Sequence, residues 1–85
     1  MADHLRLAKE HADLAKAEQD IAEGQMRITE QELRIERMQR AGQDTARAEE
    51  MLATFREMLA EWHRHRQEIL RTIERLQRAR IANFP

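Results

Sequence analysis

Two histidines lie close together in the stretch EWHRHRQE, residues 61–68, and imidazole side chains are common metal ligands. His63 and His65 are two residues apart, so on a helix they point about 160° away from each other. Paired ligands on a helix need a spacing of three or four residues. The chain has no cysteine, which also excludes thiolate sites. We therefore expect no metal ion and no cofactor.

The C-terminal part of the chain is rich in arginine, a side chain that contacts phosphate groups well. The candidate nucleic-acid contacts are Arg71, Arg75, Arg78 and Arg80. The net charge of -1 gives no general attraction to nucleic acid, and no aromatic residues alternate with these arginines to stack on bases. Such a cluster more often pairs with acids on a facing helix, such as Asp3, Glu10 and Asp13. Both interpretations stay open.

Residues for catalysis are scarce. The chain has neither serine nor cysteine and no glycine-rich phosphate loop, so the common nucleophiles and anion cradles are missing. Its glutamates lie at spacings that favour ion pairs within a helix. We expect neither an enzyme nor a small-molecule substrate.

The elements that would position these side chains are helices. Alanine, leucine, glutamate, glutamine and arginine dominate, and all five favour the helix. A chain of 85 residues forms one domain at most. No stretch approaches the roughly 20 apolar residues of a membrane span, so we expect no membrane insertion. The absence of cysteine is compatible with the expected location, the cytoplasm.

One break divides the chain into two helices. Gly42 can adopt the left-handed conformation that ends a helix, and Asp44 can cap the next one. The sequence predicts an all-α fold, a single antiparallel helical hairpin over residues 1–85. Its helices would span about residues 3–40 and 44–82, with a turn at about 41–43. The alternative is one continuous helix paired with a second chain, because a glycine inside a helix costs only about 1 kcal/mol.

The second helix carries an apolar stripe whose spacings alternate between four and three residues, as in a left-handed coiled coil. The stripe comprises Ala48, Leu52, Phe55, Leu59, Trp62, Arg66, Ile69, Ile73 and Leu76. Met51 and Met58 widen it on one flank. This pattern predicts coiled-coil-like pairing with the first helix.

The first helix has two apolar stripes on different sides. One comprises Leu7, Leu14, Ile21, Ile28 and Ile35, and the other comprises Leu5, Ala8, Ala12, Ala15, Ala22, Met26 and Leu33. Two stripes suggest two neighbours, as in a bundle of paired hairpins. The alternative is that the alanine-rich stripe is only helix-favouring surface. The candidate interaction seam is Leu5, Met26, Leu33, Met51, Met58, Trp62 and Arg66.

A register in which Ile35 faces Leu52 makes two further predictions. It puts Trp62 beside Gly24, whose missing side chain would make room for the indole ring. It also puts Arg66 within reach of Glu18. Arg66 would then either fix the register of the two helices or pack its stem and keep its charged head in water.

Residues spread over about positions 17–70 carry a resemblance to a known group. They are Gly24, Ile28, Gln31, Gly42, Asp44, Thr45, Ala48, Leu52, Phe55, Leu59, His63, Arg66 and Leu70. Through them the chain resembles short uncharacterised helical-hairpin proteins of alphaproteobacteria. The resemblance implies a bacterial, cytoplasmic helical hairpin. It implies no activity and no functional residues.

The sequence therefore favours a non-enzymatic protein that acts through protein–protein contacts. The expected partners are further copies of the chain, giving a homodimer or larger bundle, or another helical protein. The alternative is a small nucleic-acid-associated regulator that uses the arginines of its C-terminal part.

Overall fold

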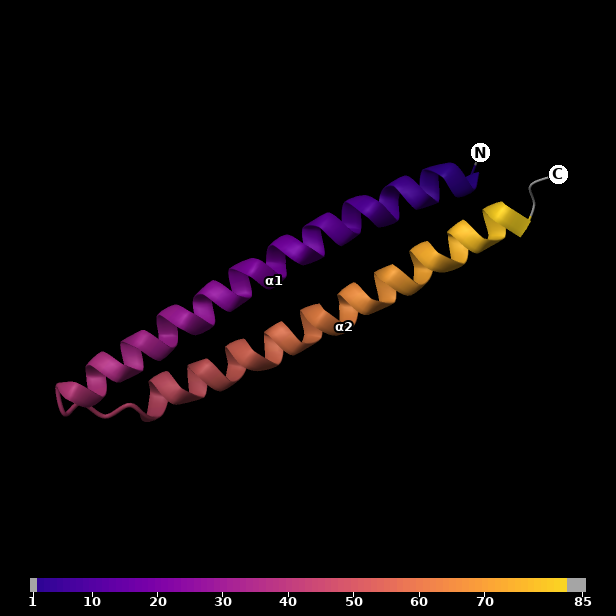
Figure 1. Ribbon diagram of the computed structural model, residues 1–85. Coiled ribbons are helices and arrows are strands. Elements are labelled where there is room, and N and C mark those ends of the chain that lie inside the picture. Colours follow the sequence, from indigo (N-terminus) through magenta and orange to yellow (C-terminus); the bar gives the residue numbers. More distant parts are fainter. Residues whose placement is uncertain (1, 83–85) are drawn as a thin grey trace.

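Two long helices form an antiparallel hairpin. In the computed structural model, which describes residues 2–82, α1 spans Ala2–Arg40 and α2 spans Ala46–Ala82 (Figure 1). The molecule measures 70 × 14 × 14 Å. The start of α1 and the end of α2 lie at the same end of the rod, far from the turn (Figure 1). The predicted all-α hairpin is confirmed, and the alternative of one continuous helix is wrong. Residue 1 and residues 83–85 of the expected domain lie outside the described part.

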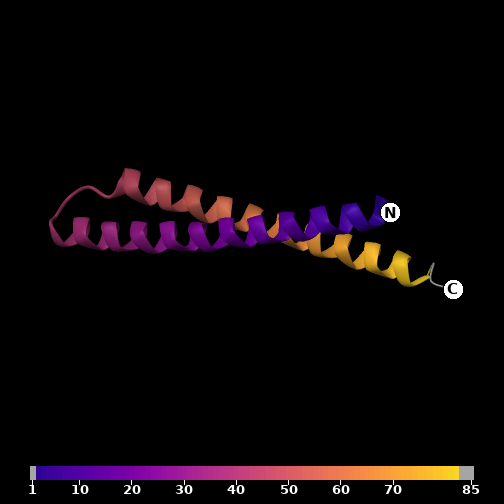
Figure 2. The same cartoon turned by 90° about the horizontal axis from the view of Figure 1, so that it is seen from above.

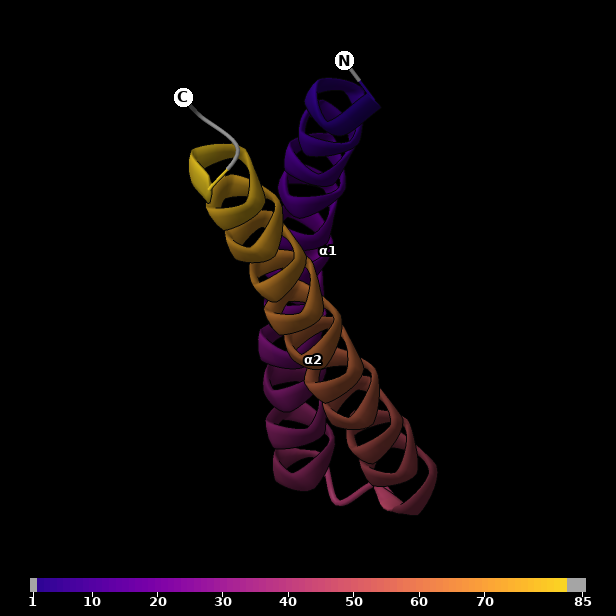
Figure 3. The same cartoon turned by 90° about the vertical axis from the view of Figure 1, so that its right-hand side faces the viewer.

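The helices cross instead of running strictly parallel. Two views at right angles to the first show the crossing, and the end-on view shows it most clearly (Figures 2 and 3). Crossing allows the side-chain ridges of one helix to fit the grooves of the other. As a result, a single stripe on each helix stays in contact with its partner along the rod.

The turn begins with a glycine-based helix stop. Gly42 has φ of 70°, the left-handed conformation predicted from the sequence. Its amide donates to the carbonyl of Gln39 at 3.0 Å, and the amide of Gln43 donates to the carbonyl of Met38 at 2.9 Å. These two bonds form a Schellman motif, which pairs carbonyls that the end of α1 would otherwise leave without partners.

The second helix begins at Ala46, two residues later than expected, so the connection covers residues 41–45. The amide of Glu49 donates to the carbonyl of Thr45, which makes Thr45 the capping position. Asp44 lies one residue earlier and its carboxylate accepts from the amide of Ala46 at 3.0 Å. Asp44 therefore satisfies a free amide as predicted, but from just outside the helix.

Among the described residues, six of the eight buried apolar residues form two clusters separated along the rod, and Ile21 and Leu76 are buried outside them. One holds Ala17, Ile69 and Ile73, with Leu7 and Leu14 packed against it. The other lies near the turn and holds Ile35, Ala48 and Leu52, with Ile28 and Met38 packed against it. Ile35 and Leu52 share a cluster, as the predicted register requires.

The packed stripe of α1 has a second column that the sequence analysis missed. It runs three residues after each member of the Leu7–Ile35 repeat and comprises Glu10, Ala17, Gly24, Gln31 and Met38. These residues are buried or partly buried, whereas the alanine-rich stripe is exposed. The column was missed because most of its members are small or polar. The three-and-four spacing from Leu7 onward was the signal that could have revealed it.

The outer faces of both helices are charged. Ion pairs four residues apart join Lys9 to Asp13 at 2.8 Å and Lys16 to Asp20 at 2.7 Å. The hydrogen bond to the aspartate, followed by charge attraction, raises the pKa of each lysine above its usual value. Within residues 2–82, neither helix carries a stretch apolar enough to cross a membrane.

Candidate interaction surface

The two long sides of the hairpin differ in chemistry. On one side, which we call the ion-paired side, charges join the helices directly. Arg66 Nε lies 3.3 Å from Glu18 Oε1, and a guanidinium nitrogen of Arg56 lies 3.5 Å from Glu32 Oε2. These are the only ion pairs between α1 and α2 among the residues that the structure describes. On the ion-paired side, charged side chains therefore bridge the two helices.

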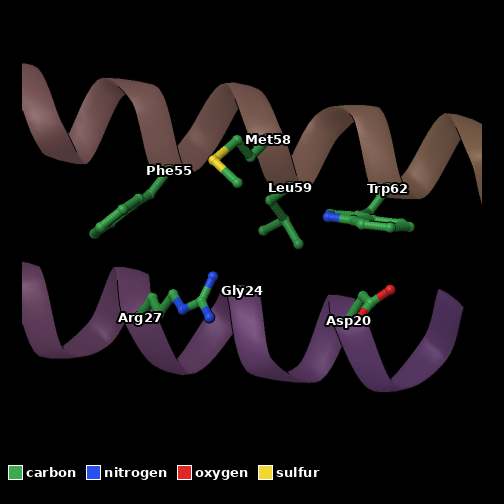
Figure 4. Close-up of a pocket in the computed structure, with 7 residues that line it drawn as sticks. All are labelled: Asp20, Gly24, Arg27, Phe55, Met58, Leu59 and Trp62. Carbon is green, nitrogen blue, oxygen red and sulfur yellow. The ribbon is translucent and has the colours of Figure 1, made fainter. Parts of the chain in front are cut away.

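The opposite side holds a hollow, which we call the notch. It is lined by Asp20, Gly24, Arg27, Phe55, Met58, Leu59 and Trp62. Its volume is about 20 Å³, room for about one water molecule. Figure 4 shows the apolar side chains projecting from α2 toward α1, where Gly24 presents bare backbone. The notch lies between the two core clusters, where α1 contributes no large side chain to its second packed column.

The reason for the glycine differs from the one predicted. A Cβ atom built on Gly24 would meet only Leu59 Cδ1, at 3.4 Å, and no atom of Trp62 within 4 Å. The prediction that Gly24 makes room for the indole is therefore wrong. The crossing of the helices brings Leu59, not Trp62, opposite the glycine. The distance is near the ordinary limit of contact, so a methyl group would fit against the flexible end of the leucine.

Large apolar side chains border the notch and remain accessible to solvent. Met58 is 45% exposed, and Met51, two turns away along α2, is 47% exposed. Phe55 and Trp62 are only partly buried, although both belong to the packed stripe. The ring of His65 meets the Trp62 ring edge-on, with centroids 5.8 Å apart. This surface, Met51, Phe55, Met58 and Trp62 together with Gly24, is the notch side of the hairpin.

The other apolar members of the predicted seam lie elsewhere. Leu5, Met26 and Leu33 are 75%, 62% and 49% exposed. They share a column of α1 that, by helical spacing, points about 180° away from its packed stripe. Leu5 lies 21 residues before Met26, about 30 Å along the helix. The structure thus divides the predicted seam into an α1 outer face and a notch side, and does not bring the two together.

Arg66 occupies the packed stripe and reaches Glu18, as predicted. Its side chain is 35% exposed and that of Glu18 is 51% exposed. The stem therefore packs between the helices while the guanidinium lies at the surface. The partly exposed arginine that also contacts Glu18 agrees with a packed stem and a solvated head, and whether the pair fixes the register stays a prediction.

The C-terminal arginines form a mixed surface. Arg71, Arg75 and Arg78 line one shallow surface of α2 together with Glu68 and Glu74. Arg78 pairs with Glu74 on its own helix, and Arg75 donates a hydrogen bond to the hydroxyl of Thr72. Arg80 is exposed in the last turn.

The expected ion pairs from these arginines to acids of the facing helix are not formed within the described residues. Asp13 pairs with Lys9, four residues before it, and Glu10 makes no ion pair. The prediction of pairing across the hairpin is therefore wrong for Glu10 and Asp13, while Asp3 lies outside the residues whose side chains are described. The reason is that helical spacing of three or four residues offers each charge a nearer partner on its own helix.

Gln31, which the sequence analysis names only for the resemblance, is a buried residue that joins the two helices. It is 6% exposed, and its side-chain amide donates to the carbonyl of Ala48 at 2.9 Å. A buried polar group needs such a partner, because leaving it unpaired costs about 1–3 kcal/mol. The hydrogen bond joins the two helices next to the core cluster near the turn.

The histidines do not gather into a site. Within residues 4–82, no three histidine, aspartate or glutamate side chains lie close enough together to hold a metal ion. His63 and His65 are exposed and separate around α2. What the surface offers chemically is apolar contact area bordered by charges of both signs.

The fold defines the class: an antiparallel helical hairpin with a polar, ion-paired side and an apolar, notched side. Compared with known proteins, the chain matches no protein-family model, no curated protein and no solved structure.

Proposed function

We propose that this protein is a non-enzymatic interaction module that associates with further copies of itself through its notch side. Two apolar stripes facing each other, each with alternating three- and four-residue spacing, support coiled-coil-like packing as the basis of the assembly. Another helical protein with a similar stripe is the second kind of partner. The cytoplasm, implied by the resemblance to alphaproteobacterial hairpins, is the compartment that we propose.

One observation carries this proposal. Four large apolar side chains, Met51, Phe55, Met58 and Trp62, follow one another along α2 at spacings of three and four residues. None of them is fully buried in the single chain. Contiguous apolar side chains on a surface with a polar surround are typical of interaction sites, and aromatic residues and methionine are enriched there. A partner would remove this stripe from water.

Other classes of function have less support. The notch holds about one water molecule, much less than the several hundred Å³ of a typical small-molecule site. The arginines of the alternative, nucleic-acid-binding function lie among glutamates that already bind one of them, Arg78. Interleaved acids weaken the attraction of such a surface for phosphate groups.

The proposal is tested by measuring the solution mass by light scattering over a wide range of concentrations. We expect a mass above 10.1 kDa that rises with concentration. Trp62 is the only tryptophan and there is no tyrosine, so its fluorescence reports on the notch directly. Its emission should shift to shorter wavelength as the protein associates. A constant monomer mass with unchanged emission would refute self-association, and the helical partner would then have to be sought by affinity capture.

A further inference from the structure

The charged residues bordering the notch side of α1 follow a simple order. Asp13, Asp20, Arg27 and Arg34 are spaced seven residues apart, so they lie on one line along the helix. Asp20 and Arg27 line the notch itself, on either side of Gly24. Two acids therefore precede the notch and two bases follow it. The two nearest positions on one side of the glycine are negative and the two nearest on the other side are positive, at matching distances, and Arg6 is the next residue of the line beyond Asp13.

The facing surface of α2 has a matching symmetry in its apolar groups. Phe55 and Trp62 are seven residues apart, and Met58 lies midway between them. All three line the notch, with one ring on each side of the methionine (Figure 4). The order of side chains, an aromatic ring, a methionine and an aromatic ring, is therefore the same from either end of the notch. The centre of this pattern lies level with Gly24, because Leu59 is the residue opposite the glycine.

We propose that a second copy of the chain docks on the notch side with two-fold symmetry. The two-fold axis lies between the two copies and passes over both helices at the level of Gly24 and Met58. This inference rests on the proposed self-association and specifies its geometry. The axis lies across the rod, so each helix meets the same helix of the partner in antiparallel orientation. Met58 meets the partner's Met58, and Phe55 meets the partner's Trp62. The product is a four-helix bundle.

The charges favour this arrangement over others. A two-fold axis at Gly24 places Asp20 opposite the partner's Arg27 and Asp13 opposite the partner's Arg34. A two-fold axis along the rod would instead place each α1 against the partner's α2, so the charges of this line would have no complementary line opposite them. The two aspartates already bind Lys16 and Lys9, but a carboxylate has lone pairs for further donors.

The self-complementary order also points to a second copy and not to an unrelated helix. In a two-fold dimer the same surface serves both partners, so each group must meet its complement on an identical chain. Opposite charges at equal distances from a centre meet that condition. Among the described residues, the ion-paired side lacks an exposed apolar stripe, and the α1 outer face carries Met26 and Leu33 with no large apolar side chain between them and Leu5 far from both.

Cross-linking tests the position of the axis. The chain has no cysteine, so a single cysteine reports on one position only. The Met58→Cys variant, on the axis, should become a covalent dimer when treated with a short thiol-specific cross-linker. Leu33→Cys, on the α1 outer face, is the matched control and should remain uncross-linked at the same concentration. Efficient cross-linking of Leu33→Cys with none of Met58→Cys would overturn the proposed geometry.

Charge exchange tests the pairing. Asp20→Arg and Arg27→Asp each create like-charge contacts at two symmetric places, so each should weaken dimerisation by about tenfold. The double variant Asp20→Arg/Arg27→Asp restores opposite charges and should recover the dissociation constant to within about threefold. If the parent chain dimerises but the single variants dimerise equally well, this geometry fails while self-association stands. If the parent chain is a monomer throughout, both fail.

Discussion

The side-chain amide of Gln31 on α1 donates a hydrogen bond to the backbone carbonyl of Ala48 on α2, with the atoms 2.9 Å apart. Gln31 is almost completely buried, in a packed column whose other members are Glu10, Ala17, Gly24 and Met38. Sliding one helix along the other would break this bond and leave the amide unpaired between the helices. A buried polar group of this kind fixes the register of two helices.

Replacing Gln31 with alanine should destabilise the hairpin by about 2 kcal/mol, because it removes the hydrogen bond and leaves a cavity. Gln31→Met keeps most of the volume and loses only the hydrogen bond, so it should cost about 1 kcal/mol less than the alanine variant. Urea denaturation followed by circular dichroism, at fixed protein concentration, measures both. Equal stability of the parent and Gln31→Ala would show that the bond contributes nothing.

The two glycines should respond to alanine in opposite directions. Gly24 lies within α1 and a methyl group fits there, so Gly24→Ala should stabilise the hairpin by about 0.5–1 kcal/mol through helix propensity. Gly42 has positive φ, so Gly42→Ala should destabilise it by about 1 kcal/mol. Thermal unfolding of the two variants beside the parent chain checks both signs. A destabilised Gly24→Ala would mean that the notch needs the space that the glycine leaves.

The ion pair between Glu18 and Arg66 should make a small, salt-dependent contribution. Both side chains are substantially exposed, so a double-mutant cycle with Glu18→Ala and Arg66→Ala should give a coupling energy of about 0.5 kcal/mol. The coupling should fall when the cycle is repeated in 1 M salt, roughly the ionic strength at which the screening length drops to about 3 Å. Coupling that is large and insensitive to salt would contradict this interpretation.

Arg66→Ala alone should cost more than Glu18→Ala. The arginine stem fills part of the packed stripe, whereas the glutamate lies at its edge. The lost stem contacts should account for most of the difference, about 1 kcal/mol. The same denaturation curves provide this comparison, and equal costs for the two variants would place the arginine stem outside the packing.

Stability at high pH should depend on the two lysines. Their pKa values are raised in the folded state by Asp13 and Asp20, so the pairs contribute fully below about pH 10.5 and are lost as pH rises through the raised values. The chain lacks tyrosine and cysteine, whose side chains would also lose protons at high pH. The melting temperature should therefore decrease slightly when the pH is raised above about 10.5. The melting temperature of a Lys9→Arg/Lys16→Arg variant should decrease less. A variant that follows the parent curve would exclude the lysines as the cause.

The hairpin itself could be predicted because it depends on signals from residues close together in the sequence. Gly42 ends one helix through its left-handed backbone, and Asp44 offers an acceptor to the next helix. The stripe of α2 follows a strict spacing, so its packed face was also readable, including Arg66 and its reach to Glu18. These features depend on neighbours in the sequence or on a single repeat.

The details between the helices could not be predicted in the same way. Whether Gly24 meets Trp62 or Leu59 depends on how the helices cross, which shifts facing residues by about one turn. Gln31 was overlooked because polarity usually indicates a surface position. The division of the predicted seam between two surfaces also depends on the register, which fixes where each flank of α2 lies against α1.

The notch at Gly24 leaves a short segment of α1, just after the buried Ile21, with fewer packed side chains than the segments at the two core clusters. Backbone amides exchange with solvent through local opening, and the free energy of that opening follows the packing of the segment concerned. Amides of α1 beside Gly24 should therefore exchange deuterium sooner than those beside Ala17 or Ile35, even though all belong to one unbroken helix. Hydrogen exchange followed by mass spectrometry would show this as a fast segment between two slow ones. When a partner covers the notch, the exchange rate of this segment should decrease most. Assembly would therefore be visible as a local loss of flexibility in α1.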